Sequence, residues 1–171
     1  MNKKLELAKK IWNAVTTAVV ALVVICAVLL LGAKVFGFKT FSVISGSMEP
    51  TYSVGDLLYV KEAEFEDIKV GDPITFTLNK DLTVATHRVV RIDTEKQCFY
   101  TKGDANADED RNPVSYKNVI GVPKFSIPWL GGIADFVKTD RGLVTVGAVG
   151  VLLIASMIIP DVIEKKSSKQ E

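Results

Sequence analysis

Residues 11–33 read IWNAVTTAVVALVVICAVLLLGA and contain no charged side chain. An apolar helix of about 20 residues is long enough to cross the hydrocarbon core of a bilayer. Lysines at positions 3, 4, 9 and 10 precede the run, as they would in a cleaved signal peptide. However, the apolar core of a signal peptide is only about 7–15 residues long. We therefore expect a retained transmembrane helix over residues 11–33, preceded by a cytoplasmic segment over residues 1–10.

A second apolar run covers residues 143–159 and ends before Pro160. At about 17 residues it lies at the lower limit for a spanning helix, and a buried core helix or strand is the alternative. Lysines are frequent both before the first run and after the second, and basic residues accumulate on the cytoplasmic side of membranes. We expect a multi-pass protein of the cell membrane, with a second transmembrane helix over residues 143–159. Residues 160–171 would then form a cytoplasmic tail, and residues 38–140 an extracytoplasmic domain.

The composition agrees with one small domain between two apolar ends. Hydrophobic residues make up 48% of the chain, which is high for a soluble domain, whereas charged residues make up an ordinary 24%. The net charge of +1 does not favour a nucleic acid partner. Cys26 lies in the first apolar run and Cys98 in the polar middle, so we expect no disulfide between them. A single histidine argues against a metal site built from histidines.

The middle of the chain predicts a small, mostly antiparallel β domain. Short segments rich in β-branched and aromatic residues alternate there with turn sequences. The expected strands cover residues 56–60, 72–78, 84–92 and 98–101, with turns at 55–56, 71–73, 79–81 and 103–106. A brief helix is expected within residues 62–70. The predicted fold class is therefore mainly β, flanked by N- and C-terminal transmembrane helices.

Residues 125–133 are too apolar for a free loop. Phe125 and Trp129 have rings that suit the interface between membrane and water. Packing of these rings against the β domain is the alternative, and both interpretations stay open.

Residues 42–51, SVISGSMEPT, follow the first apolar run, and we expect the chemistry here. Gly46 lies between two serines and allows a sharp turn, and Pro50 prevents a helix from continuing. This geometry would leave Ser47 exposed. Taken alone, S-G-S is an ordinary polar turn, because a serine hydroxyl is a poor nucleophile unless a neighbouring base takes its proton.

The base could be His87, which is the only imidazole in the chain, or one of several lysines. His87 lies in the expected strand over residues 84–92, and imidazoles are efficient bases near neutral pH. A carboxylate commonly orients such an imidazole. Residues 102–113 form an acidic loop that would otherwise be a solvated loop or a weak calcium site, but it lacks the alternate ligands of an EF-hand. Its carboxylates are Asp104, Asp108, Glu109 and Asp110.

Four segments occur in the order of the sequence boxes of type I signal peptidases. They read SGSMEPT at 45–51, VGDPITF at 70–76, THRVV at 86–90, and KGDAN at 102–106 followed by Asp110 and Arg111. The chain resembles the histidine-using branch of this family, found in archaea, in the endoplasmic reticulum complex and in some spore-forming bacteria. In the other branch a lysine stands where His87 stands here. Pro73 departs from the pattern, because the family more often has an aliphatic residue there.

The resemblance implies an enzyme, a membrane-bound serine endopeptidase (signal peptidase I) that removes signal peptides from exported preproteins. It implies that Ser47 is the nucleophile and that His87 is the general base and then the general acid. Asp110 is the preferred orienting carboxylate, and Asp104 is the second candidate. The backbone N–H of Ser47 and the hydroxyl of Ser45 match the oxyanion hole of the family. No cofactor and no metal are called for.

The implied partners are the signal peptides of secretory preproteins and the lipid bilayer, with no nucleic acid. The protein translocation machinery is a further candidate. Two other functions stay open. An autoproteolytic regulator of the related Ser/Lys repressor type would need a DNA-binding domain and a strand lysine, and neither is visible. A non-enzymatic two-span membrane scaffold with an extracytoplasmic binding domain would use S-G-S-M as a turn.

Overall fold

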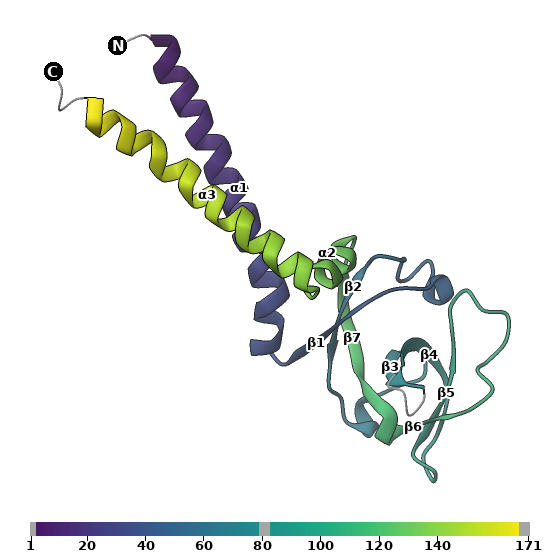
Figure 1. Cartoon of the computed structure of the whole chain (residues 1–171). Coiled ribbons are helices and arrows are strands. Elements are labelled where there is room, and N and C mark those ends of the chain that lie inside the picture. Colours follow the sequence, from purple (N-terminus) through teal and green to yellow (C-terminus); the bar gives the residue numbers. More distant parts are fainter. Residues whose placement is uncertain (1–2, 79–82, 168–171) are drawn as a thin grey trace. The chain divides into compact units, whose positions relative to one another are not determined.

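The computed structural model describes residues 3–78 and 83–167 (Figure 1). The chain forms two compact units. The first combines the two ends of the chain, up to Gly32 and from Phe136 onward, and the second is Ala33–Asp135.

The first unit contains two long helices, α1 (Lys3–Val35) and α3 (Asp140–Ser167). Their segments Lys9–Val35 and Asp140–Ile158 are long and apolar enough to cross a membrane, and only 6% of each is buried in the structure. This exposure argues against the buried core helix considered for the second apolar run. Both helices extend beyond the runs that predicted them. α3 continues past Pro160, since a proline removes one backbone hydrogen bond but does not by itself end every helix.

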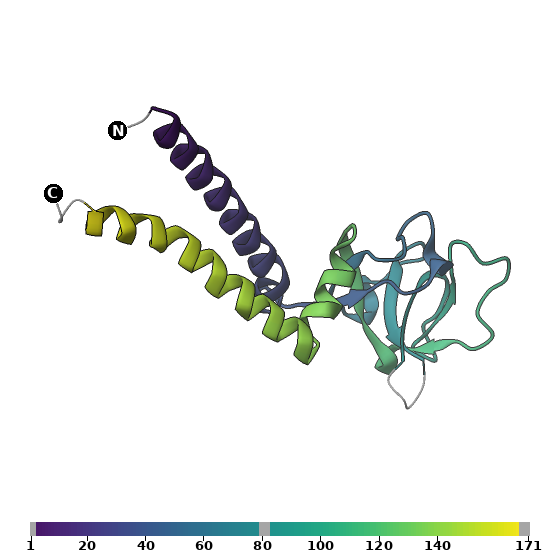
Figure 2. The same cartoon turned by 45° about the horizontal axis from the view of Figure 1, so that its top comes forward.

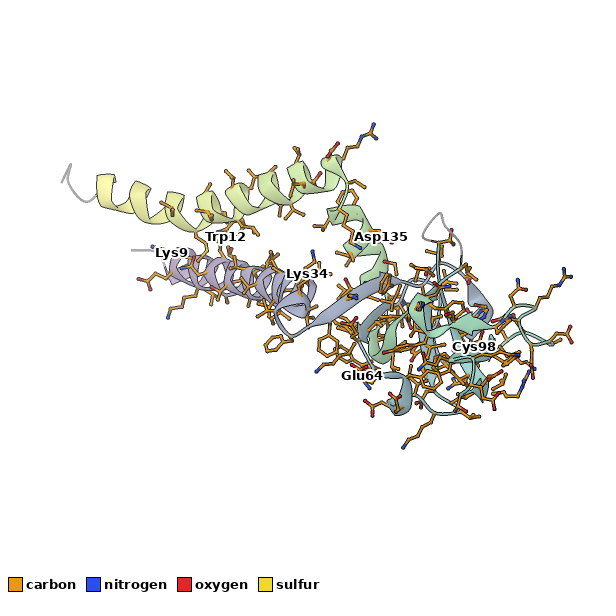
Figure 3. The ribbon with its side chains drawn as sticks, turned by 90° about the horizontal axis from the view of Figure 1, so that it is seen from below. Lys9, Trp12, Lys34, Glu64, Cys98 and Asp135 are labelled. Atoms are coloured by element: carbon orange, nitrogen blue, oxygen red, sulfur yellow. The ribbon has the colours of Figure 1, made fainter. Side chains whose placement is uncertain are left out.

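The two helices run in opposite directions, so that the start of α1 and the end of α3 lie at the same end of the pair (Figures 1 and 2). Trp12 of α1 points toward α3 (Figure 3), and its Nε1 donates a hydrogen bond to the carbonyl oxygen of Ser156 at 3.5 Å. This bond joins the first half of α1 to the second half of α3.

The second unit is built on an antiparallel sheet, which confirms the mainly β fold class. Its described strands lie in the order β1-β2-β7-β3-β4-β5-β6. They are β1 (Phe38–Ser42), β2 (Leu57–Lys61), β3 (Pro73–Thr77), β4 (Val84–Asp93), β5 (Cys98–Lys102), β6 (Val114–Ser115) and β7 (Val119–Ile127). The expected strands match β2, β3, β4 and β5 closely, whereas the strand pattern did not reveal β1, β6 and β7.

A short 3-10 helix, Phe65–Asp67, lies where a brief helix was expected. Pro73 is the first residue of β3, a position where a strand tolerates a missing N–H. The expected turn at 79–81 lies outside the described residues.

β7 is the strand that unites the sheet. Its C-terminal half pairs with β2, and its N-terminal half pairs with β3. At Gly121, where β7 passes from one neighbour to the other, φ is 153° and a Cβ would collide with the carbonyl of Lys61. Only glycine fits this close approach between strands.

Among the residues that the structure describes, two apolar clusters support the sheet. The larger one contains side chains from β3 to β7 and from the segment before β3, and its fully buried members include Ile74 and Phe99. The smaller one contains Met48, Tyr52, Leu58 and Val60. Because Met48 comes directly after Ser47, the smaller cluster anchors the candidate nucleophile to β2.

Residues 125–133 were expected either at the membrane interface or packed against the β domain, and the structure differs from residue to residue. Phe125 stacks on Tyr59 with ring centroids 4.5 Å apart, and Leu130, at the start of α2 (Leu130–Val137), is buried. Packing against the β domain therefore accounts for Leu130 and for one face of the Phe125 ring, although Phe125 remains 45% exposed. Trp129 is 83% exposed, so its ring is not packed in this way.

Candidate active site

Ser47 lies in a single 3-10 turn, Gly46–Met48, which follows β1. Packing holds the turn in place, because the side chain of Met48 is only 3% exposed and lies in the smaller apolar cluster. The hydroxyl of Ser45 lies 3.4 Å from that of Ser47. The structure therefore presents two neighbouring hydroxyls on a turn that is held by packing.

His87 reaches this turn from β4. Its Nε2 lies 3.2 Å from Oγ of Ser47, and its side chain is 14% exposed. The imidazole also packs against the Phe76 ring in a T-shaped arrangement, with the two ring centroids 6.2 Å apart. A residue in the middle of a paired strand has little backbone freedom, so the sheet positions the ring.

Asp110 completes a chain of hydrogen bonds. Its Oδ2 lies 2.6 Å from Nδ1 of His87, and its side chain is 25% exposed. When Nδ1–H donates to this carboxylate, Nε2 of the neutral ring carries the lone pair and faces the hydroxyl of Ser47. The three residues that the resemblance implied as nucleophile, base and orienting group are thus brought together.

Asp104 lies outside this chain of hydrogen bonds. It forms an ion pair with Arg88, whose Nε donates to Oδ1 at 2.7 Å and whose Nη2 donates to Oδ2. Thr51 also donates its hydroxyl to Asp104. The hydrogen bonds from Arg88 lower the pKa of Asp104, and the same bonds raise the pKa of Arg88. Asp104 is therefore an ionised structural partner of Arg88 at neutral pH. The remaining acidic residues of the loop, Asp108 and Glu109, are exposed.

The acidic loop is hydrogen-bonded directly to the turn Gly46–Met48, which carries the candidate nucleophile Ser47. The backbone N–H of Ala105 donates to the carbonyl oxygen of Ser47 at 2.9 Å. A Cβ at Gly103 would lie 2.6 Å from that same carbonyl oxygen, so a larger residue would push the two segments apart. The strand and turn patterns did not reveal this contact. The only sequence signal for it is Gly103 in the KGDAN segment, which is equally typical of an ordinary turn.

A cavity of about 880 Å³ lies beside the triad. Ser47, His87 and Asp110 line it together with residues of β1 and β4, and much of its wall is apolar. Representative apolar lining residues are Phe41, Val43, Leu58, Phe76 and Ala85. A wall of this kind suits an extended, largely apolar peptide.

Comparison with known proteins places this chain in a family. Residues 15–127 match the family model described as signal peptidase, peptidase S26. The chain belongs to this family. It is similar to signal peptidase I W of Bacillus subtilis, with 46% identity over 88 residues, which is 50% of this chain and 46% of that protein.

Relatives from eukaryotes align over a longer part of the chain. The signal peptidase complex catalytic subunit SEC11C of Rattus norvegicus is 32% identical over 126 residues, 65% of each protein. The catalytic subunit SEC11 of Eremothecium gossypii is 33% identical over 127 residues, 68% of this chain and 75% of that protein. The chain thus spans about half the length of the Bacillus relative and just under two thirds of the rat relative.

Proposed function

We propose that this protein is a membrane-bound serine endopeptidase that removes signal peptides from exported preproteins. The observation that carries the proposal is the chain of hydrogen bonds from Ser47 through His87 to Asp110. The membership of the signal peptidase family supports the same reaction and the same class of substrate.

In the first step of the reaction, Oγ of Ser47 attacks the carbonyl carbon of the scissile peptide bond while Nε2 of His87 accepts the hydroxyl proton. Asp110 accepts the Nδ1–H bond and stabilises the imidazolium that forms. The imidazolium then donates its proton to the leaving amine, and the new N-terminus of the mature protein departs. In the second step His87 activates water, which releases the signal peptide from Ser47.

The negative charge on the carbonyl oxygen needs donors as it develops. The backbone N–H of Ser47 and the hydroxyl of Ser45 are the groups that we assign to this role. The short distance between the two serine hydroxyls, 3.4 Å, supports a common position near the reacting carbonyl. The substrate would lie extended in the cavity between residues 43–47 and residues 84–87 of β4, as an added strand with shallow pockets.

Cleavage of a purified preprotein tests this proposal. Full-length protein in detergent is incubated with a preprotein that has alanine one and three residues before the expected cut. We expect one cut after the A-x-A site, identified by mass spectrometry of both products. A matched preprotein with tryptophan directly before the cut should remain whole. Failure to cut the first preprotein under any membrane-like condition would favour the non-enzymatic scaffold.

We further infer that both ends of the chain are cytoplasmic and that the unit Ala33–Asp135 lies on the outer side of the cell membrane. The lysines at both ends of the chain support this orientation. The antiparallel arrangement of α1 and α3 also supports it, because it leaves the start of α1 and the end of α3 at one end of the helix pair. Substrate and enzyme would then share one membrane, which raises their effective concentration.

The orientation predicts the result of a protease-protection experiment. A tag placed after Glu171 should survive protease added to intact cells, while a tag inserted beside the exposed Lys96 in the β4–β5 turn should be removed. Permeabilised cells should lose both tags. Digestion of the C-terminal tag in intact cells would show that α3 does not span the membrane in this direction.

The two aspartates should respond differently to removal of their charge. Asp110→Asn is expected to lower kcat by about 100-fold or more with little change in KM, because the amide no longer selects the reactive tautomer of His87. Asp104→Asn is the matched control and should reduce the rate less. Steady-state kinetics on the preprotein measure both effects. A large loss for Asp104→Asn in a stably folded protein, with full activity for Asp110→Asn, would exchange the two assignments.

Asp104→Asn should instead lower the stability of the β domain. A carboxylate whose pKa is lowered on folding contributes stability above its unfolded pKa of about 4, and loses that contribution as the pH falls through the lower folded pKa. The difference in unfolding midpoint between wild type and Asp104→Asn should therefore be large at pH 7. It should shrink as the pH falls below about 4.

A further inference from the structure

Thr101 is a completely buried residue of β5 that contacts Asp110. Its Oγ1 donates a hydrogen bond to Oδ2 of Asp110 at 2.6 Å. Its carbonyl oxygen accepts the backbone N–H of Asp110 at 2.8 Å. Asp110 lies in a loop without regular secondary structure, so these two bonds attach it to the sheet.

Two donors meet at one oxygen of Asp110. Nδ1 of His87 lies 2.6 Å from Oδ2, the same oxygen that accepts the hydroxyl of Thr101. A carboxylate oxygen has two lone pairs and can accept both bonds. The final torsion of an aspartate side chain is broad, so one bond from the imidazole would restrain the carboxylate only weakly. The second bond selects the rotation in which Oδ2 faces His87.

We propose that Thr101 is a positioning residue for catalysis, which holds the carboxylate of Asp110 in the orientation that accepts Nδ1–H of His87. This inference rests on the proposed function, because it deepens the account of the same triad. Thr101 is absent from the described residues that line the cavity. Its effect on the reaction therefore passes through Asp110 and not through the substrate.

Two substitutions separate a donor role from a packing role. Thr101→Val keeps the shape of the side chain but removes the hydroxyl, whereas Thr101→Ser keeps the hydroxyl but removes a buried methyl group. If Thr101 positions Asp110, Thr101→Val should lower kcat about tenfold or more at nearly constant KM, and Thr101→Ser should retain most of the rate. If Thr101 only fills space, Thr101→Ser should be the more damaging variant. That order would overturn the proposal.

A double-mutant cycle tests whether Thr101 acts through Asp110. In the background of Asp110→Asn, Thr101→Val should change kcat by less than about twofold. The carboxylate that Thr101 would orient is already absent in that background. A further tenfold loss in that background would contradict the proposal.

A spectroscopic measurement does not depend on cleavage. His87 is the only histidine in the chain, so histidine labelled with ¹⁵N gives one imidazole in the NMR spectrum of the full-length protein in detergent. We expect the Nδ1–H resonance of the wild type to be retained in Thr101→Ser and to shift or exchange away in Thr101→Val. An unchanged resonance in Thr101→Val would refute the positioning role. If the wild type cuts no preprotein, the proposed function fails, but this resonance still decides whether Thr101 orients Asp110 toward His87.

Discussion

Ser47→Ala is expected to abolish cleavage of the preprotein. The methyl group cannot attack a carbonyl carbon, and loss of a triad nucleophile in a serine protease costs about a millionfold in kcat. The cut product should therefore fall below detection in a gel-based assay with the purified variant. The side chain of Met48 still anchors the turn, so thermal unfolding should be close to that of the wild type.

Ser53→Ala provides a matched control for this experiment. Ser53 is an exposed serine between the turn Gly46–Met48 and β2, and it does not line the cavity. Its substitution should leave the cleavage rate unchanged. Normal cleavage by a folded Ser47→Ala variant would remove Ser47 from the mechanism and would require another nucleophile.

His87→Ala is expected to lower kcat by at least the 10²–10⁴-fold that general base catalysis commonly supplies, and by as much as Ser47→Ala if the two residues act fully as one unit. The variant leaves the hydroxyl of Ser47 without the acceptor at 3.2 Å. Since the two residues act as one unit, the double variant with Ser47→Ala should be no slower than Ser47→Ala alone. Single-turnover cleavage of the preprotein measures these rates, and circular dichroism checks that the sheet is intact.

His87→Lys tests the chemistry of the base. A lysine acts as the base in the other branch of the family, so this variant should retain a trace of activity above that of His87→Ala. The lysine must lose its proton first, and this requires removal of water from the ammonium group. A folded His87→Ala variant with full activity would exclude the imidazole from the reaction.

The sequence predicted the strands whose patterns are regular. β3, β4 and β5 are rich in β-branched and aromatic residues, and turn sequences bound them. β7 escaped prediction because it contains Gly121 and Pro123, which weaken a strand pattern, and because it pairs with two different neighbours. Pairing between distant segments is decided by tertiary packing, which a local pattern does not record.

Local sequence patterns were also insufficient to assign every residue of the candidate site. The sequence boxes pointed to Ser47, His87 and two aspartates, but composition alone did not separate the roles of Asp104 and Asp110. Successive side chains of a strand point to opposite faces, and the structure shows His87 bound to Asp110 and its neighbour Arg88 bound to Asp104. The alternation along β4 thus assigns each carboxylate a different partner. The supporting hydroxyl of Thr101 was invisible because a threonine in a strand is ordinary.

The central place of β7 has a consequence for the timing of synthesis. Ser47 follows β1 on one side of the described sheet, and His87 lies in β4 on the other side, while β7 is the strand between β2 and β3. A ribosome makes β7 after all the other strands. A nascent chain that has not yet been extended through residue 127 lacks the complete strand that joins the two halves of the sheet. If the proposed function holds, cleavage activity should therefore appear only after the chain has been synthesised through β7, which ends at Ile127.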